Sequence, residues 1–131
     1  MRIWGEVPDV KPFLAGASCV IAPLRIARGV QNKVLEAMAM ARPVLLTPEA
    51  ATGIDAHDGE QWMIEAADAA AWVSRFGELR ESSERLQLIG RSAREFVLER
   101  HAWDAMLAPL EALVLGEAAS PPAEEGTLHA A

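Results

Sequence analysis

Four residues with helical spacing could bind an anion together. The segment GVQNKVLEAMA begins at Gly29 and places an amide, an amine and a carboxylate at Asn32, Lys33 and Glu36. These three positions lie three, four and seven residues after Gly29, so a helix over residues 29–41 would bring all four onto one face.

This face favours the binding of a nucleotide. Free backbone N–H groups and the helix dipole attract phosphate to the first turn, and a glycine lets the backbone come close to the ligand. Lys33 would add a positive charge, and Glu36, one turn deeper, would accept hydrogen bonds from a vicinal diol. A diphosphate joined to a ribose would satisfy both ends. The plainer interpretation stays open: Lys33 and Glu36 form a surface ion pair, and Gly29 is an ordinary loop residue.

The elements around this face predict an α/β fold. Strands are expected over 2–7, 19–24, 44–46 and 60–66, and helices over 8–17 and 29–41. The continuous apolar runs at 19–24 and 44–46 suit strands that are buried on both faces. The alternation is typical of a Rossmann-like parallel sheet with helices on both faces, whose ligands bind outside the carboxyl ends of the strands. The loop over 25–30 is such a place.

Three C-terminal helices are expected to complete the domain. Asp68 can cap the first, and Ser82 or Ser83 begins the second. The first should turn four apolar side chains to the core, namely Trp72, Val73, Phe76 and Leu79. The third should be kinked by Pro109. It carries an apolar stripe formed by Trp103, Met106, Leu107, Leu110, Leu113 and Val114.

Composition and charge exclude several classes of function. The chain has 19 acidic and 12 basic residues and a net charge of −7, which argues against a nucleic-acid partner. One cysteine and three histidines do not predict a metal site, and Cys19 cannot form an internal disulfide. No apolar run reaches the roughly 18 residues of a bilayer span. We expect a cytoplasmic protein, with at most peripheral contact to the inner membrane. Residues 116–131 are rich in Ala, Pro, Glu and Gly, which predicts a disordered tail.

Two runs of sequence resemble a known family. GEVPDVKPFLAGASCVIAPL and GVQNKVLEAMAMARPVLLTPEAATGI resemble the C-terminal nucleotide-sugar-binding domain of retaining glycosyltransferases of family 4, which have the GT-B fold. The most specific part is a glycine, three residues, a lysine, two residues and a glutamate, followed by Ala-Met-Ala and Pro-Val. NKVLEAMAM is also similar to bacterial exosortase-associated sugar transferases of exopolysaccharide biosynthesis. The resemblance makes residues 1–115 a partial nucleotide-sugar-binding domain.

The resemblance implies an activity and roles for individual residues. It implies a hexosyltransferase that moves a sugar from a nucleotide diphosphate sugar to an acceptor sugar or lipid-linked sugar, with retained configuration and no metal or other cofactor. In the resembling family, the residue at the position of Glu36 binds the ribose hydroxyls, and the backbone amides at Gly29 and Val30 hold the diphosphate. Asn32 and Lys33 lie on the same face.

The chain departs from the family's pattern in two ways. Many members carry a second glutamate eight residues before the position of Glu36, and this chain has Arg28 there. Sugar recognition therefore stays open, and Arg28 or Arg25 would serve the diphosphate instead. The acceptor domain and the opening strands of a whole enzyme do not precede residues 7–8, which would lie near the base. We therefore expect an incomplete chain that is inactive alone.

Two further expectations follow from the sequence. The alternative function is a non-catalytic nucleotide-binding or interaction module of the same fold. A regulatory domain of the flavodoxin-like type would need an acidic cluster at the strand ends, and the sequence offers none. We also expect a homo-oligomer, because a bare apolar stripe on the last helix, or an open sheet edge, would be covered by another copy.

Overall fold

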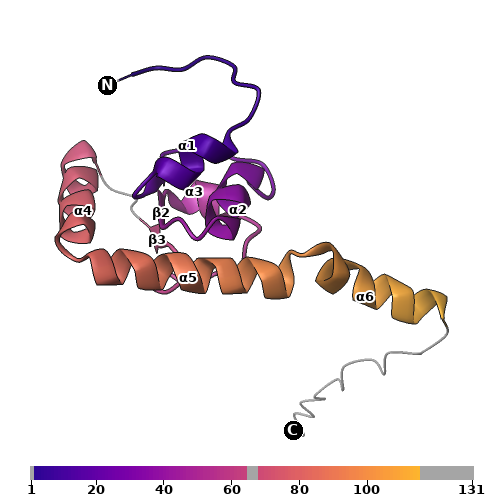
Figure 1. Cartoon of the computed structure of the whole chain (residues 1–131). Coiled ribbons are helices and arrows are strands. Elements are labelled where there is room, and N and C mark those ends of the chain that lie inside the picture. The colour runs from indigo at the N-terminus through magenta and orange to yellow at the C-terminus, as the bar shows by residue number, and fades with distance from the viewer. Residues whose placement is uncertain (1, 65–67, 116–131) are drawn as a thin grey trace, which may run out of the picture.

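Short strands and helices alternate in the first half of the chain, and three helices follow (Figure 1). The structure is a computed structural model that describes residues 2–64 and 68–115, so the tail expected over 116–131 lies outside the described residues. In chain order the elements are α1 (Lys11–Gly16), β1 (Val20–Ala22), α2 (Asn32–Ala39), β2 (Val44–Leu46), α3 (Pro48–Ala51), β3 (Met63–Ile64), α4 (Ala69–Glu81), α5 (Ser83–Arg100) and α6 (Trp103–Val114).

The three strands form one parallel sheet in the order β1-β2-β3, which confirms the predicted α/β class. Val20 of β1 lies opposite Val44, and Leu45 of β2 lies opposite Met63. All three residues of β2 are buried, because the strand has a neighbour on each side and apolar side chains against both faces.

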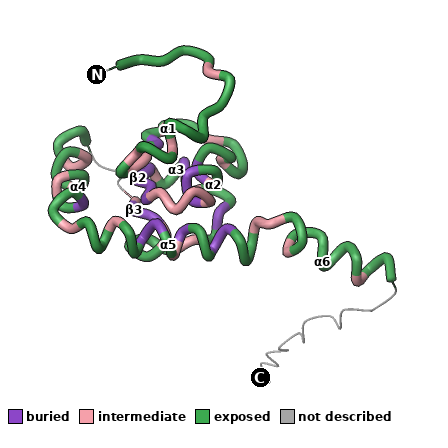
Figure 2. The backbone as a smooth tube through the Cα atoms, in the orientation of Figure 1, coloured by how far each residue is buried: buried purple, intermediate pink, exposed green. Residues whose placement is uncertain are grey.

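Helices cover both faces of the sheet through two apolar clusters. Val44 and Leu46 belong to the larger cluster, which α2 and the second half of α5 complete. Leu45 belongs to the smaller one, with Leu79 of α4 and Ile89 of α5. Figure 2 shows that the buried residues gather in the sheet, α2 and the middle of α5, whereas α6 is exposed along almost its whole length. The core therefore lies at one end of a long helical arm.

Two of the predicted strands differ from the structure. The segment over 2–7 is not a strand, because it leads away from the sheet and no strand of the described chain pairs with it (Figure 1). The strand predicted over 19–24 is shorter, and it is not buried on both faces. Ile21 is 58% exposed because it lines an open groove beside α4, which does not cover this face of β1. Of the weak strand expected over 60–66, the described residues form only β3, and residues 65–66 lie outside the described residues.

The helix predicted over 29–41 begins only at Asn32. Gly29 has a φ of +65°, and Gln31 is extended, so the chain becomes helical after both of them. The chain after β2, for which no helix was predicted, contains α3, and the hydroxyl of Thr47 caps its first turn.

The caps of the C-terminal helices are confirmed, but the predicted core face of α4 is only partly right. Asp68 Oδ1 accepts hydrogen bonds from two backbone N–H groups of α4, and Ser82 Oγ accepts one from Arg85. Leu79 is buried, whereas Val73 is 73% exposed because only one side of α4 meets the smaller cluster. No residue of α6 is buried, and the helix runs through Pro109; the kink stays a prediction.

Candidate functional site

The helix α2 presents its polar residues to solvent, as its spacing predicts. Asn32, Lys33 and Glu36 are exposed, and the opposite side of the helix is buried in the larger cluster through Val34, Ala37 and Met38. Lys33 and Glu36 form no ion pair within the described chain. Their charges are therefore available to a ligand.

The N-terminus of α2 is open. Among the described residues, no side chain caps this helix, and its first turn contains no acidic residue. Gln31, the residue before the helix, turns its side-chain amide back and donates to Gly29 O at 3.1 Å. Val34 N already donates to Gln31 O at 2.9 Å, so the N–H groups that remain for an anion at the positive end of the helix dipole are those of Asn32 and Lys33.

The loop before α2 is held against the turn after α3. Val30 and Gly53 pack so closely that a Cβ on Gly53 would lie 3.1 Å from Val30 Cγ2. Arg28 and Gly29 are exposed beside this contact. The positive φ of Gly29 is one that a side chain would disfavour, so glycine is needed for the turn that leads into the helix.

Glu36 lines a pocket of about 470 Å³ between α1 and α2, which we call the Glu36 pocket. Residues 7–8 line the same pocket, so the segment expected near the base and the carboxylate expected on the ribose meet there. Asp9 and Lys11 also line it, and Asp9 Oδ1 accepts a hydrogen bond from Lys11 N at 2.9 Å. Sequence reasoning missed these two residues, although their position next to 7–8 could have indicated them.

Arg25 lies in a second pocket of about 320 Å³, the Arg25 pocket, at the carboxyl ends of β1 and β2. Thr47 and Asp68 line it too, and Thr47 Oγ1 donates to Leu24 O at 2.6 Å, which ties the ends of the two strands together. The predicted site residues therefore do not all line one pocket. Glu36 and Arg25 line different pockets, and five residues line neither of the two: Arg28, Gly29, Val30, Asn32 and Lys33.

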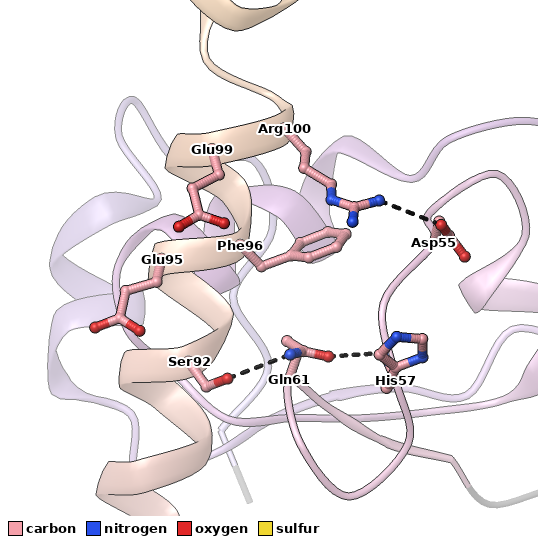
Figure 3. A pocket seen from close by; sticks show the side chains of 8 residues that line it. All are labelled: Asp55, His57, Gln61, Ser92, Glu95, Phe96, Glu99 and Arg100. Carbon is pink, nitrogen blue, oxygen red and sulfur yellow. Dashed lines mark hydrogen bonds and ion pairs between the residues drawn. The ribbon is translucent and has the colours of Figure 1, made fainter. Parts of the chain in front are cut away.

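A third pocket, of about 200 Å³, lies between the loop before β3 and α5 (Figure 3). Gln61 bridges its two sides, because its amide group donates to Ser92 Oγ at 3.3 Å and accepts from His57 N at 2.8 Å. Arg100 forms an ion pair with Asp55 at 3.3 Å. His57 is exposed. These contacts fasten the loop to α5, and sequence reasoning missed them because the partners are far apart in the chain.

Two kinds of feature are absent from the described part of the chain, a metal-binding cluster and a membrane-spanning helix. It contains no cluster of three or more His, Cys, Asp or Glu side chains arranged to hold a metal ion. None of its helices combines the length and apolar character needed to cross a bilayer.

Comparison with known proteins identifies the family. Neither the curated proteins nor the solved structures contain a significant match to this chain. Residues 1–82, which include the sheet, α2 and both the Glu36 and Arg25 pockets, match the family model of the glycosyl transferases group 1. Because this match covers more than half of the 131 residues, the chain belongs to the group 1 glycosyl transferases.

Proposed function

We propose that this chain is the donor-binding part of a retaining glycosyltransferase of family 4, and that it binds a nucleotide diphosphate sugar at α2. The observation that carries the proposal is that Glu36 and residues 7–8 line one pocket. The group 1 family accounts for the sugar-transfer chemistry in general. The hexosyl donor, the exosortase-associated type and a cytoplasmic site at the inner membrane are finer parts of the same proposal.

The Glu36 pocket suits a nucleoside. Its volume of about 470 Å³ lies within the range of roughly 300–1,000 Å³ that is usual for small-molecule sites. Val10 and Leu14 give it an apolar wall for a base, and Glu36 gives it a carboxylate that would accept hydrogen bonds from the ribose diol. Asp9 and Lys11 would then contact the polar edge of the base.

The diphosphate would lie at the first turn of α2. Asn32 precedes Glu36 by four residues, which is about 6 Å along the helix axis, so one ligand can reach from the carboxylate to the open N–H groups. Lys33 and Arg28 would add positive charge to this end. Arg25, at the strand ends, would meet the far phosphate or the sugar.

The proposed chemistry depends on the charge of the leaving group. When the glycosidic bond to the diphosphate breaks, the anomeric carbon becomes oxocarbenium-like and the diphosphate gains negative charge. Backbone N–H groups that already point at this charge stabilise the transition state more than the ground state. The acceptor, a sugar or a lipid-linked sugar in this proposal, would attack on the face that retains the configuration.

Calorimetric titration with a nucleoside diphosphate tests the proposal. The unaltered chain should bind, and Glu36→Gln should weaken binding at least about tenfold, because a hydrogen bond to a charged group contributes about 1.5–3 kcal/mol. Glu81→Gln is the matched control, since Glu81 is an exposed helical glutamate outside both pockets, and it should bind as the unaltered chain does. Absent binding, or equal binding by the Glu36 variant, would contradict the site.

The alternative, a non-catalytic nucleotide-binding module, is favoured by one observation. Arg28 stands where the resembling enzymes carry a glutamate that touches the donor sugar, and it is exposed next to the open helix end. Calorimetric comparison of a nucleotide diphosphate sugar with the matching nucleoside diphosphate separates the two functions. Tighter binding of the nucleotide sugar supports the donor-binding part of a transferase, whereas equal binding of the two ligands supports the module.

A further inference from the structure

Asp9 and Lys11 are the two charged residues of the Glu36 pocket that would meet the base of a bound nucleotide. Both residues are exposed, and neither forms an ion pair within the described chain. Glu36 and the first turn of α2 cannot select a base, because the ribose and the diphosphate are common to all ribonucleotide donors. The choice of base must therefore depend on other residues of this pocket.

A backbone contact at the start of α1 fixes the position of the Asp9 carboxylate. Asp9 Oδ1 accepts a hydrogen bond from Lys11 N, the first residue of the helix, at 2.9 Å. An ionised carboxylate has about four lone-pair sites on its two oxygens, so Oδ2 and a second site of Oδ1 remain. Asp9 therefore offers a ligand two adjacent acceptors and no donor.

The bases differ in what their Watson–Crick edges present to two adjacent acceptors. Guanine presents N1–H and the N2 amino group side by side, so both carboxylate oxygens of Asp9 would accept a hydrogen bond. Adenine and cytosine place a ring-nitrogen acceptor beside their amino group, and uracil places a carbonyl oxygen on each side of N3–H. With these three bases one carboxylate oxygen would face another acceptor and lose its hydrogen bond.

The other residues of the pocket also suit guanine. Next to N1–H, the same edge of guanine carries the acceptor O6, and the Lys11 ammonium group can only donate. The volume of about 470 Å³ lies in the usual range for small-molecule sites, and Val10 and Leu14 offer apolar surface to the flat face of a purine.

We propose that the donor is a guanine nucleotide diphosphate sugar, whose N1–H and N2 amino group donate to the Asp9 carboxylate while Lys11 donates to O6. This inference rests on the proposed nucleotide site at α2 and adds the identity of the base. Asp9 is thus a specificity-determining residue, because it contacts the part of the ligand that distinguishes one nucleotide donor from another.

Calorimetric titration of the full chain with four nucleoside diphosphates tests the choice of base. GDP should bind at least about tenfold more tightly than UDP or ADP, because only guanine pairs with both carboxylate oxygens. IDP differs from GDP only in lacking the N2 amino group. It should bind at least about threefold more weakly than GDP, because one hydrogen bond to the carboxylate is lost.

Asp9→Asn separates recognition of the base from binding of the nucleotide. The amide keeps one acceptor and replaces the other by a donor, so it cannot pair with N1–H and the N2 amino group together. The variant should bind GDP at least about tenfold more weakly, should no longer prefer GDP to IDP, and should not lose affinity for UDP. Asp104→Asn is the matched control. It removes the same charge from an exposed residue of α6 outside the pocket, and it should keep the preference for GDP.

The outcomes distinguish this inference from the function on which it rests. Equal affinities for GDP, UDP and ADP, or an Asp9→Asn variant that still prefers GDP to IDP, would overturn the choice of guanine and leave the nucleotide site intact. Absence of binding by all four nucleotides would overturn both the site and the choice of base.

Discussion

Cys19, the residue before β1, is partly buried against the smaller apolar cluster that contains Leu45 and Leu79, and this position controls its chemistry. Burial raises the pKa of its thiol above the ordinary value, although backbone hydrogen bonds at Leu45 and Val20 act in the opposite direction. The folded chain should therefore react with iodoacetamide more slowly than the urea-unfolded chain at neutral and mildly alkaline pH, because the thiolate is the reactive form. Equal rates, followed by mass spectrometry, would contradict this.

The raised pKa of Cys19 also determines the direction in which stability changes with pH. The folded state keeps the thiol proton at pH values where the unfolded chain, with a pKa of about 9.0, loses it. The contribution of Cys19 to the free energy of unfolding should therefore be present below pH 9 and decline above it. Urea titrations should show that the difference in free energy of unfolding between the unaltered chain and Cys19→Ser becomes smaller as the pH rises past 9.

Gly90 allows α5 to touch the end of α2. A Cβ at this position would lie 2.2 Å from Ala41 O, so Gly90→Ala must push the helix away from the chain that follows α2. We expect it to lower the free energy of unfolding by about 1–3 kcal/mol. The matched control is Gly77→Ala in α4, where nothing lies within 4 Å of the added Cβ and the change should stabilise the helix by about 0.5–1 kcal/mol.

At the residue level, the sequence was informative wherever spacing within one helix decides the outcome. The exposed face with Lys33 and Glu36 follows from periodicity alone. The position of Gly29 outside the helix does not follow from periodicity. The start of α2 depends on the backbone conformations of Gly29 and Gln31, and the sequence allowed either residue to be helical. Asp9 and Lys11 line the Glu36 pocket because α1 lies next to α2. No local sequence pattern predicts this tertiary contact.

Among the elements, α4 depends on a single cap. Asp68→Ala removes the acceptor for two backbone N–H groups and should lower the free energy of unfolding by about 1 kcal/mol. Asp68→Asn keeps an acceptor oxygen and should recover most of the loss. Chemical denaturation measures both variants, and an alanine variant as stable as the unaltered chain would show that α4 is held by its packing contacts and not by its cap.

The strands β1 and β2 show that similar apolar runs can differ in burial. The runs that became β1 and β2 are alike in sequence, and both suggested strands buried on two faces. Only β2 is so, because apolar clusters cover both of its faces, whereas α4 leaves one face of β1 open at Ile21. Which helix covers which part of a sheet is a tertiary property, so the sequence predicted the strands without predicting that Ile21 would be exposed.

For the whole molecule, the homo-oligomer expected from the exposed apolar side chains of α6 predicts that thermal stability depends on concentration. A dimer is stabilised by mass action, so the Tm of the unaltered chain should rise between about 1 µM and about 100 µM. Differential scanning calorimetry should show this rise for the unaltered chain and for Ile3→Glu, and no rise for Leu110→Glu. A Tm that is independent of concentration in all three chains would indicate that α6 stays unpartnered.

The contact between Val30 and Gly53 gives the proposed site a built-in spectroscopic reporter. Any ligand that shifts the loop before α2 must move Val30, which packs directly against Gly53. The amide resonance of Gly53 should therefore move in a nitrogen–proton correlation spectrum when the loop is occupied, although Gly53 itself lines neither the Glu36 nor the Arg25 pocket. A signal from the turn after α3 would thus record occupancy at the neighbouring helix end without a label on the ligand.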